Sequence, residues 1–375
     1  MTSHGSLTRN RVLATPRIPA APGMAAHCTV PRWSALLPLL LCATEFCVGA
    51  ETGSAASGAA GANIDPRLSG GATTVFVSHA GAFSLNAANM SSRRKGDFLI
   101  GNDFFEDPWV IAPSSTDLRD GLGPLFNVSA CQSCHLNDGR GHAPGSAEDD
   151  ADSLLIRFSR PSVSAAASDR IHGDRIHGDP LHVDPVPGDP VYGGQLQDRG
   201  IPGVPAEARI RVSYRERPIT FRDGTTITLR EPVIAFADWA YGPPAADLVF
   251  SPRVAPPVIG MGLLEAIAES DLLALEDPED RNGDGVSGRA NRVPDLAADR
   301  MVVGRFGWKA GQPGVRQQTA AAFNGDMGLT TTLFPDLSCS SAQTACRDAP
   351  DGRDPATGVE VRDDILAFVT HYVSN

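Results

Sequence analysis

Apolar residues recur at helical spacing in four stretches of the chain, at residues 92–105, 262–275, 315–323 and 361–373. A period near 3.6 predicts a helix with one buried face, so we expect four helices that pack through these faces. The side chains expected to reach the core from the first and last of them are Phe98, Leu99, Phe104, Phe105, Ile365, Leu366, Val369 and Val373.

Strand patterns are confined to the middle of the chain. Residues 208–214 alternate polar and apolar side chains, as a half-buried strand does. Residues 219–221 and 225–229 flank Asp223-Gly224, which predicts a hairpin. The 38 glycines and 30 prolines favour long irregular connections, most of all over residues 160–205. We therefore expect a mainly α fold with a small β insertion at about residues 160–255 and much irregular loop.

The first fifty residues have the pattern of a signal peptide. Four arginines precede an apolar stretch over residues 34–43, and Val48-Gly49-Ala50 suits cleavage before Glu51. That stretch is too short to span a bilayer, which takes about 20 residues. The charged region is long, and Met24 would be a more typical start. Residues 51–84 are expected to form a flexible mature N-terminus.

Charge and cysteine content narrow the function classes. A net charge of -12 argues against a nucleic acid or an anionic membrane as partner. Removal of residues 1–50 leaves two local cysteine pairs, Cys131 with Cys134 and Cys339 with Cys346. An even, paired count fits an oxidising compartment, so we expect a periplasmic protein in which Cys339 and Cys346 form a disulfide.

The segment Cys131-Gln132-Ser133-Cys134-His135 is a c-type haem attachment motif. Its two thiols, one helical turn apart, meet the two vinyl groups of a haem, and the adjacent imidazole then binds the iron. A thioredoxin-like redox pair needs no following histidine. A zinc site needs two more ligands, and Cys339 and Cys346 bring no partner histidine. The export signal favours haem over both alternatives.

Further motifs surround the haem motif. They are Trp109–Thr116, Gly121–Asn127, Cys131–Gly141, Tyr192–Asp198, Ser251–Pro257, Gly262–Ile267, Arg305–Ala310 and Gly325–Gly328. In this order they resemble the bacterial di-haem oxidoreductase family, whose members are labelled peroxidases or thiol oxidoreductases. The resemblance covers roughly residues 85–375 and implies a cytochrome c-like haem domain there.

One departure from the family bears on activity. Its members carry a second Cys-x-x-Cys-His beyond the helix at residues 361–373, and this sequence has none. We expect a chain cut short before the second haem segment, with one covalent haem. The resemblance implies a periplasmic oxidoreductase that passes electrons, in intact relatives to peroxide. The alternatives are a non-catalytic mono-haem electron carrier that depends on a periplasmic partner, and an inactive fragment.

A c-type haem used for electron transfer usually has a second axial ligand, often a methionine. Of Met261, Met301 and Met327, only Met327 follows a helix in a glycine-flanked loop and lies in a family motif. Met327 is therefore the candidate ligand, and a core methionine that fills a gap is the equal alternative. Met261 opens an apolar helix and is better explained as core.

Other candidate sites are weaker. Asp280, Asn282, Asp284 and Val286 match the first half of a calcium loop, but the twelfth position is Asn291, so a calcium site and an empty turn are equal alternatives. His172, His177 and His182 lie in a tandem repeat that is better explained as a solvated loop. Glu265 is a weak candidate for a pocket acid–base. Arg140, Arg305 and Lys309 are candidates for contacts with haem propionates.

Overall fold

A computed structural model describes residues 65–68, 70–146, 149, 152–160 and 188–375. The chain divides into two compact units, residues 1–62 and 63–375, and only the second contains described residues. The expected signal peptide and the histidine repeat at residues 170–182 lie outside the described residues.

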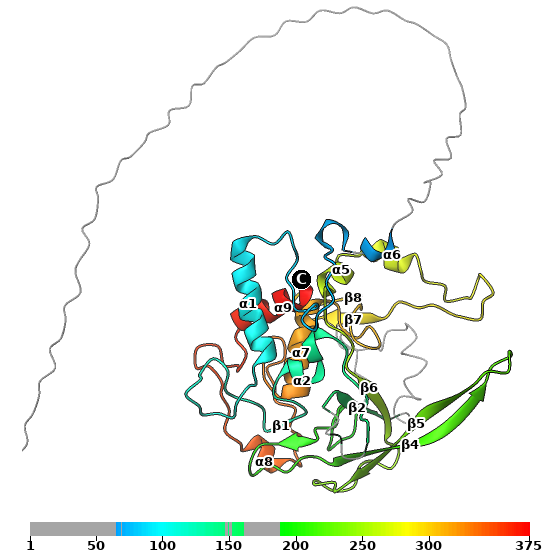
Figure 1. Cartoon of the computed structure of the whole chain (residues 1–375). Helices are drawn as coiled ribbons and strands as arrows, with labels where there is room; N and C mark the ends of the chain where they lie inside the picture. Colours follow the sequence, from blue (N-terminus) through cyan, green and yellow to red (C-terminus); the bar gives the residue numbers. More distant parts are fainter. Residues whose placement is uncertain (1–64, 69, 147–148, 150–151, 161–187) are drawn as a thin grey trace, which may run out of the picture. The chain divides into compact units, whose positions relative to one another are not determined.

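Three helices form the framework of the main core: α1 (Ser92–Glu106), α7 (Val315–Met327) and α9 (Asp363–Ser374). Helix α9 packs against both of the others, and Figure 1 shows α1 in cyan, α7 in orange and α9 in red close together. The contact between α1 and α9 is close because Gly101 lies directly against the backbone carbonyl of Phe368. A side chain at position 101 would push the two helices apart.

Aromatic rings fill the space between α1 and α9. The ring of Tyr372 lies 4.7 Å from that of Phe98 and 5.3 Å from that of Phe105, centroid to centroid. Phe98, Phe105 and Tyr372 are all at most 5% exposed. Rings at such distances add to the stabilisation from apolar burial. The helices at residues 92–105, 315–323 and 361–373 are confirmed, and so is every expected core contact except Leu99, which is 62% exposed.

The haem motif lies against this core in short elements. Strand β1 (Leu125–Phe126) pairs with β3 (Arg199–Gly200) just before the motif. Helix α2 (Cys131–Cys134) carries the two cysteines, and the 3₁₀ helix η3 (Leu136–Asp138) follows directly after His135. Tyr372 of α9 donates a hydrogen bond of 2.7 Å to Asp138, which fastens η3 to the last helix.

A second core is built from strands. Strand β2 (Leu154–Ser159) pairs with β6 (Val249–Val254), and β4 (Arg209–Thr220) pairs with β5 (Thr226–Ala237) in a long hairpin (Figure 1). Trp239 joins the two pairs, because its ring contacts Phe158 of β2 and Phe236 of β5. The hairpin expected around Asp223-Gly224 is confirmed, and its strands are longer than the sequence pattern indicated.

The remaining elements are short. They are the 3₁₀ helices η1 (Pro66–Leu68) and η2 (Gly71–Thr73), the helices α5 (Met261–Glu265), α6 (Glu269–Leu273) and α8 (Thr344–Arg347), and the paired strands β7 (Arg292–Asp295) and β8 (Arg300–Val303). In the part of the chain that the structure describes, no helix is both long and apolar enough to cross a bilayer.

The expectation of a mainly α fold is wrong. Helices account for 24% and strands for 21% of the described residues, and the strands form several small antiparallel sheets. Strand β2 was missed because its partner β6 lies far along the chain, and six residues of alternation carry little local signal.

The helix expected over residues 262–275 is two helices, α5 and α6. The break has a visible cause at the end of α5. Arg305 donates hydrogen bonds to the backbone carbonyls of Glu265 and Ile267, at 3.3 and 2.6 Å. Carbonyls that are capped by a side chain no longer need the next helical turn.

Two glycines of α1 test the role of close helix packing. We expect Gly101→Ala to lower the free energy of unfolding by about 2–4 kcal/mol, since the new methyl would overlap the Phe368 carbonyl. Gly96→Ala is the matched control, because no atom of a described residue outside the helix backbone and the adjacent residues lies within 4 Å of a Cβ added there. It should stabilise the helix by about 0.5–1 kcal/mol. Urea unfolding measures both, and equal effects would contradict the packing argument.

Candidate functional site: a cysteine-paired haem pocket

The motif residues are placed by a single turn of helix. Ala130 is extended just before α2, and the backbone N–H of His135 donates to the Cys131 carbonyl at 3.0 Å. This turn sets Cys131 and Cys134 on one side of α2, with His135 directly after it. The spacing that the sequence predicted for haem attachment is therefore present in the backbone.

The imidazole of His135 is held by one hydrogen bond. Its Nδ1 lies 2.8 Å from the backbone carbonyl of Pro256. A carbonyl can only accept, so Nδ1 carries the proton and Nε2 is the nitrogen left with a free lone pair. Burial lowers the pKa of His135, and the Pro256 carbonyl opposes that shift. A neutral imidazole with a fixed tautomer is what an iron ligand requires.

The two thiols are free and poorly suited to redox catalysis by themselves. Burial, with a contribution from the charge of Asp326, raises the pKa of Cys131 to about 12, and the pKa of Cys134 is raised for the same reasons. Cys134 also donates to the backbone carbonyl of Asp152 at 2.8 Å. A thioredoxin-like pair needs a lowered thiol pKa, so this environment argues against that alternative.

A pocket opens beside the motif. Its walls are mostly apolar, and they come from α1, α2, α7 and α9. The lining residues are Phe105, Val128, Cys131, Cys134, His135, Thr319, Ala322, Phe323, Asp326, Met327, Val369 and Val373. The ring of Phe105 lies 6.2 Å from that of His135. Paired thiols, an oriented imidazole and apolar walls together fit a haem attached through the two cysteines.

The structure brings Met327 into this pocket with the motif residues. The expected loop position is wrong, because Met327 is the last residue of α7 and Gly328 ends the helix with a φ of 67°. Its side chain is 2% exposed. Met261 at the start of α5 and Met301 in β8 do not line the pocket.

One buried amide joins the elements around the pocket. The Gln195 Nε2 atom lies within 2.9 Å of Asn127 Oδ1, the Gly325 carbonyl and Asp326 Oδ1. On its other side, Gln195 accepts a hydrogen bond of 2.7 Å from Arg157 of β2. The backbone N–H of Asn127 donates to the Asp326 carbonyl at 2.8 Å. These contacts fix the approach to the haem motif against the end of α7.

Comparison with known families agrees with this geometry. The family model described as "Di-haem oxidoreductase, putative peroxidase" matches residues 63–374. The chain belongs to the di-haem oxidoreductase family. Membership implies a haem cofactor, and the Cys131–His135 motif lies within the matched residues. Neither curated proteins nor solved structures gave a match.

Glu265 does not line the pocket beside the Cys131–His135 motif. Its carboxylate accepts a hydrogen bond of 2.8 Å from the backbone N–H of Val315, at the start of α7. Glu265 and Arg305 line a separate cleft with Arg300 and Arg316. The observed role of Glu265 is thus to cap α7, where a negative charge meets the positive end of the helix. Arg305 caps α5, as described above.

The oxygens of the calcium-like loop bond to its own backbone. Both carboxylate oxygens of Asp280 accept from the Gly285 N–H, and Asp284 accepts from the Val286 N–H at 2.8 Å. The Asn282 side chain accepts from the Asp284 N–H at 3.0 Å. Among the described residues, no group of three or more histidine, cysteine or acidic side chains is placed to hold a metal ion. Calcium binding here stays a prediction.

Sequence reasoning missed Pro256, Gln195 and Asp326. Each lies in a segment that carried the family resemblance, and that was the only available signal, because nothing local indicates what these residues contact. Pro256 is 121 positions from His135 along the chain, and Gln195 is 131 positions from Asp326. Their roles depend on tertiary structure alone.

The Gln195 network gives a test of stability. We expect Gln195→Ala to lower the free energy of unfolding by about 2–4 kcal/mol, because Asn127 and Asp326 would lose a buried donor. Gln318→Ala on α7 is the control, since that half-buried glutamine makes no side-chain hydrogen bond to any residue that the structure describes. Its cost should stay below about 1 kcal/mol. Urea unfolding measures the loss of unfolding free energy in both variants. Equal losses would contradict the proposed stabilisation by the Gln195 hydrogen bonds.

Proposed function

We propose that this chain is an exported, periplasmic c-type haem oxidoreductase, with one haem bound covalently at Cys131 and Cys134 and with His135 as the iron ligand. The observation that carries the proposal is the hydrogen bond from His135 Nδ1 to the Pro256 carbonyl. It fixes the imidazole tautomer beside two free thiols in an apolar pocket. Among the described residues no group of three or more histidine, cysteine or acidic side chains is placed to hold a zinc ion, and the raised pKa of Cys131 argues against a dithiol site.

The bound haem would supply one-electron exchange at its iron. The chain's own residues hold and shield it. Phe105 and Phe323 are at most 3% exposed and keep water from the pocket walls, together with Val369. A dry surrounding raises the influence of every nearby charge, and Asp326 is the acidic group that lines the pocket.

Met327 is the second residue that would bind the haem iron. It lines the pocket with His135, and its thioether is the only methionine sulfur among the lining residues. A thioether ligand favours the reduced iron and therefore suits electron transfer. Peroxide turnover instead requires an open position on the iron, so the two activities make opposite demands on Met327.

Export and partner remain parts of the proposal. The N-terminal signal pattern and the Cys339–Cys346 pair, which the structure joins as a disulfide, both support an oxidising compartment. A periplasmic electron donor or acceptor is the expected partner. A calcium ion at Asp280–Val286 would be structural.

Haem attachment is tested first. Protein exported to the periplasm of a host that matures c-type cytochromes should give a c-type pyridine haemochrome band, with one haem per chain. The double variant Cys131→Ala, Cys134→Ala should lose it, since no thioether can form. The other cysteine pair is the control, and Cys339→Ser with Cys346→Ser should keep the band. Wild-type protein without a c-type band would refute the proposal.

Ligation by Met327 has a spectroscopic signature. We expect Met327→Leu to abolish the weak far-red band of a sulfur–iron bond, while Met261→Leu leaves it unchanged. Leucine conserves side-chain volume, so each substitution should cost less than about 1.5 kcal/mol of stability. If wild type lacks the band but turns over peroxide, Met327 is a core residue and the iron has an open position. Turnover with peroxide thus separates the enzyme from an electron carrier.

A further inference from the structure

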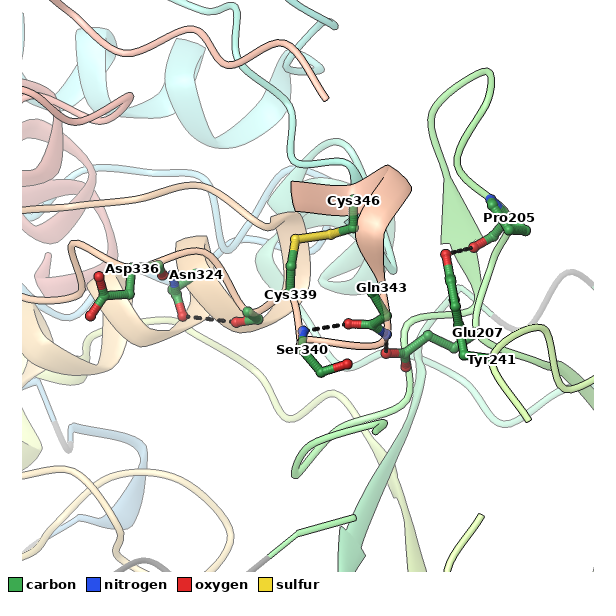
Figure 2. The surroundings of a disulfide bond; sticks show 10 residues. Pro205, Glu207, Tyr241, Asn324, Asp336, Cys339, Ser340, Gln343 and Cys346 are labelled. Atoms are coloured by element: carbon green, nitrogen blue, oxygen red, sulfur yellow. Dashed lines mark hydrogen bonds between the residues drawn. A yellow bond between two sulfur atoms is a disulfide. The ribbon is translucent and has the colours of Figure 1, made fainter. Parts of the chain in front are cut away.

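The Cys339–Cys346 disulfide closes a short ring around a buried glutamine. The Cα atoms of the two cysteines lie 5.9 Å apart, and Gln343 between them is 0% exposed. Within the ring, Gln343 Oε1 accepts from the Ser340 N–H at 2.7 Å, and the Gln343 N–H donates to the Ser340 carbonyl at 3.1 Å. The Gln343 amide nitrogen therefore points away from the ring and toward Glu207, as Figure 2 shows.

A first chain of hydrogen bonds leads from this ring to helix α7. Gln343 Nε2 donates to Glu207 Oε1 at 2.6 Å (Figure 2). The other oxygen of Glu207 accepts from the Gln197 N–H at 2.6 Å. The side chain of Gln197 then donates to the Gly325 carbonyl at 2.7 Å. Glu207, Gln197 and Gln343 are all at most 5% exposed, so water cannot substitute freely for these bonds.

A second chain reaches α7 directly. Ser338, next to Cys339, donates to Asn324 Oδ1 at 3.3 Å. Asn324 Nδ2 donates to the Asp336 carbonyl at 3.0 Å, and Figure 2 shows this side of the ring. Both chains therefore end on adjacent residues, Asn324 and Gly325, in the last turn of α7. The next two residues, Asp326 and Met327, line the haem pocket.

We propose that the Cys339–Cys346 pair is a thiol-responsive latch, whose reduction by a dithiol frees Gln343 from Glu207 and loosens the last turn of α7 beneath the haem pocket. The functional consequence of the latch rests on the proposed function, because the last turn of α7 would hold the haem. Hydrogen exchange tests the latch itself without reference to haem.

The chemistry is a thiol–disulfide exchange. A thiolate of the dithiol attacks the sulfur of Cys339, which is half-buried, and Cys346, which is 1% exposed, leaves as a thiolate that takes up a proton. The second thiol of the reductant then displaces Cys339. Two electrons and two protons pass to the protein, and the reductant becomes a disulfide.

The protonation of Glu207 depends on the hydrogen bond that Gln343 donates to it. Burial, with smaller contributions from the nearby Asp189 and Asp198, raises the pKa of Glu207 to about 8. The hydrogen bonds from Gln197 and Gln343 oppose that shift. Tyr192 and Tyr241 are the other titratable groups that interact with Glu207. Without Gln343, the carboxyl favours its protonated form more strongly and accepts hydrogen bonds less well.

The effect is expected to be local. The ring spans a sequence separation of seven residues, and so short a loop constrains the unfolded chain less than a long one does. Its main contribution in the folded state is therefore to fix Gln343 and the segment from Asp336 to Ser338. Reduction should release these contacts and leave the helix framework intact.

Hydrogen exchange with mass spectrometry on the full-length, exported protein tests the latch. With a dithiol present, we expect amides in residues 195–207 and 323–330 to exchange about tenfold faster. Amides of α1 and of the β4–β5 hairpin should be unchanged. Alkylation of Cys339 and Cys346 in the same sample verifies that the bond was reduced. Unchanged exchange in a fully reduced sample would overturn the proposal.

Two variants distinguish a local effect of the latch from a general folding defect. Gln343→Ala keeps the disulfide and should reproduce the faster exchange at residues 195–207 before any dithiol is added. Cys339→Ser with Cys346→Ser should exchange fast with or without dithiol. A dithiol response that persists in this double variant would contradict the assignment to this pair. Pyridine haemochrome on the same preparations tests the proposed function separately.

Discussion

The organisation around the pocket depends on one side-chain amide, that of Gln195. Its nitrogen and oxygen face partners on three separate parts of the chain: the approach to the haem motif, the end of α7, and strand β2. Gln195 and Asn127 are buried and Asp326 is half-buried, so an unmet bond at any of these three would carry a desolvation cost. Satisfying them together favours one arrangement of the three segments, and one of them, the end of α7, lines the pocket through Asp326 and Met327.

The two cysteine pairs of the described chain have different surroundings. Cys131 and Cys134 are separate thiols whose pKa values are raised by burial and by Asp326. Their protonated form is therefore favoured. Cys339 and Cys346 are bonded to each other and pack with Leu125 and Ile201 in a small cluster of their own. In the folded chain the two pairs therefore lie in separate apolar clusters.

Local signals predicted the haem motif, the hairpin at Asp223-Gly224 and three of the four helices, because each is encoded within a few turns or residues. The mainly α fold class failed, since pairs such as β2 with β6 depend on contacts between distant residues. The site shows the same division. Cys131–His135 could be identified from spacing. The Pro256 carbonyl that orients His135 could not, because every residue has a backbone carbonyl and the sequence does not indicate which one accepts the bond.

The packing of α9 across α1 has a consequence for the order of folding. The Nε2 atom of His371 lies 3.1 Å from the Arg94 carbonyl, across 277 positions of sequence, and Val369 and Val373 of α9 line the haem pocket. The pocket wall is therefore completed only after almost the whole described chain has been synthesised. Contacts of such long range slow folding, so the thiols of α2 stay accessible until α9 has packed against α1.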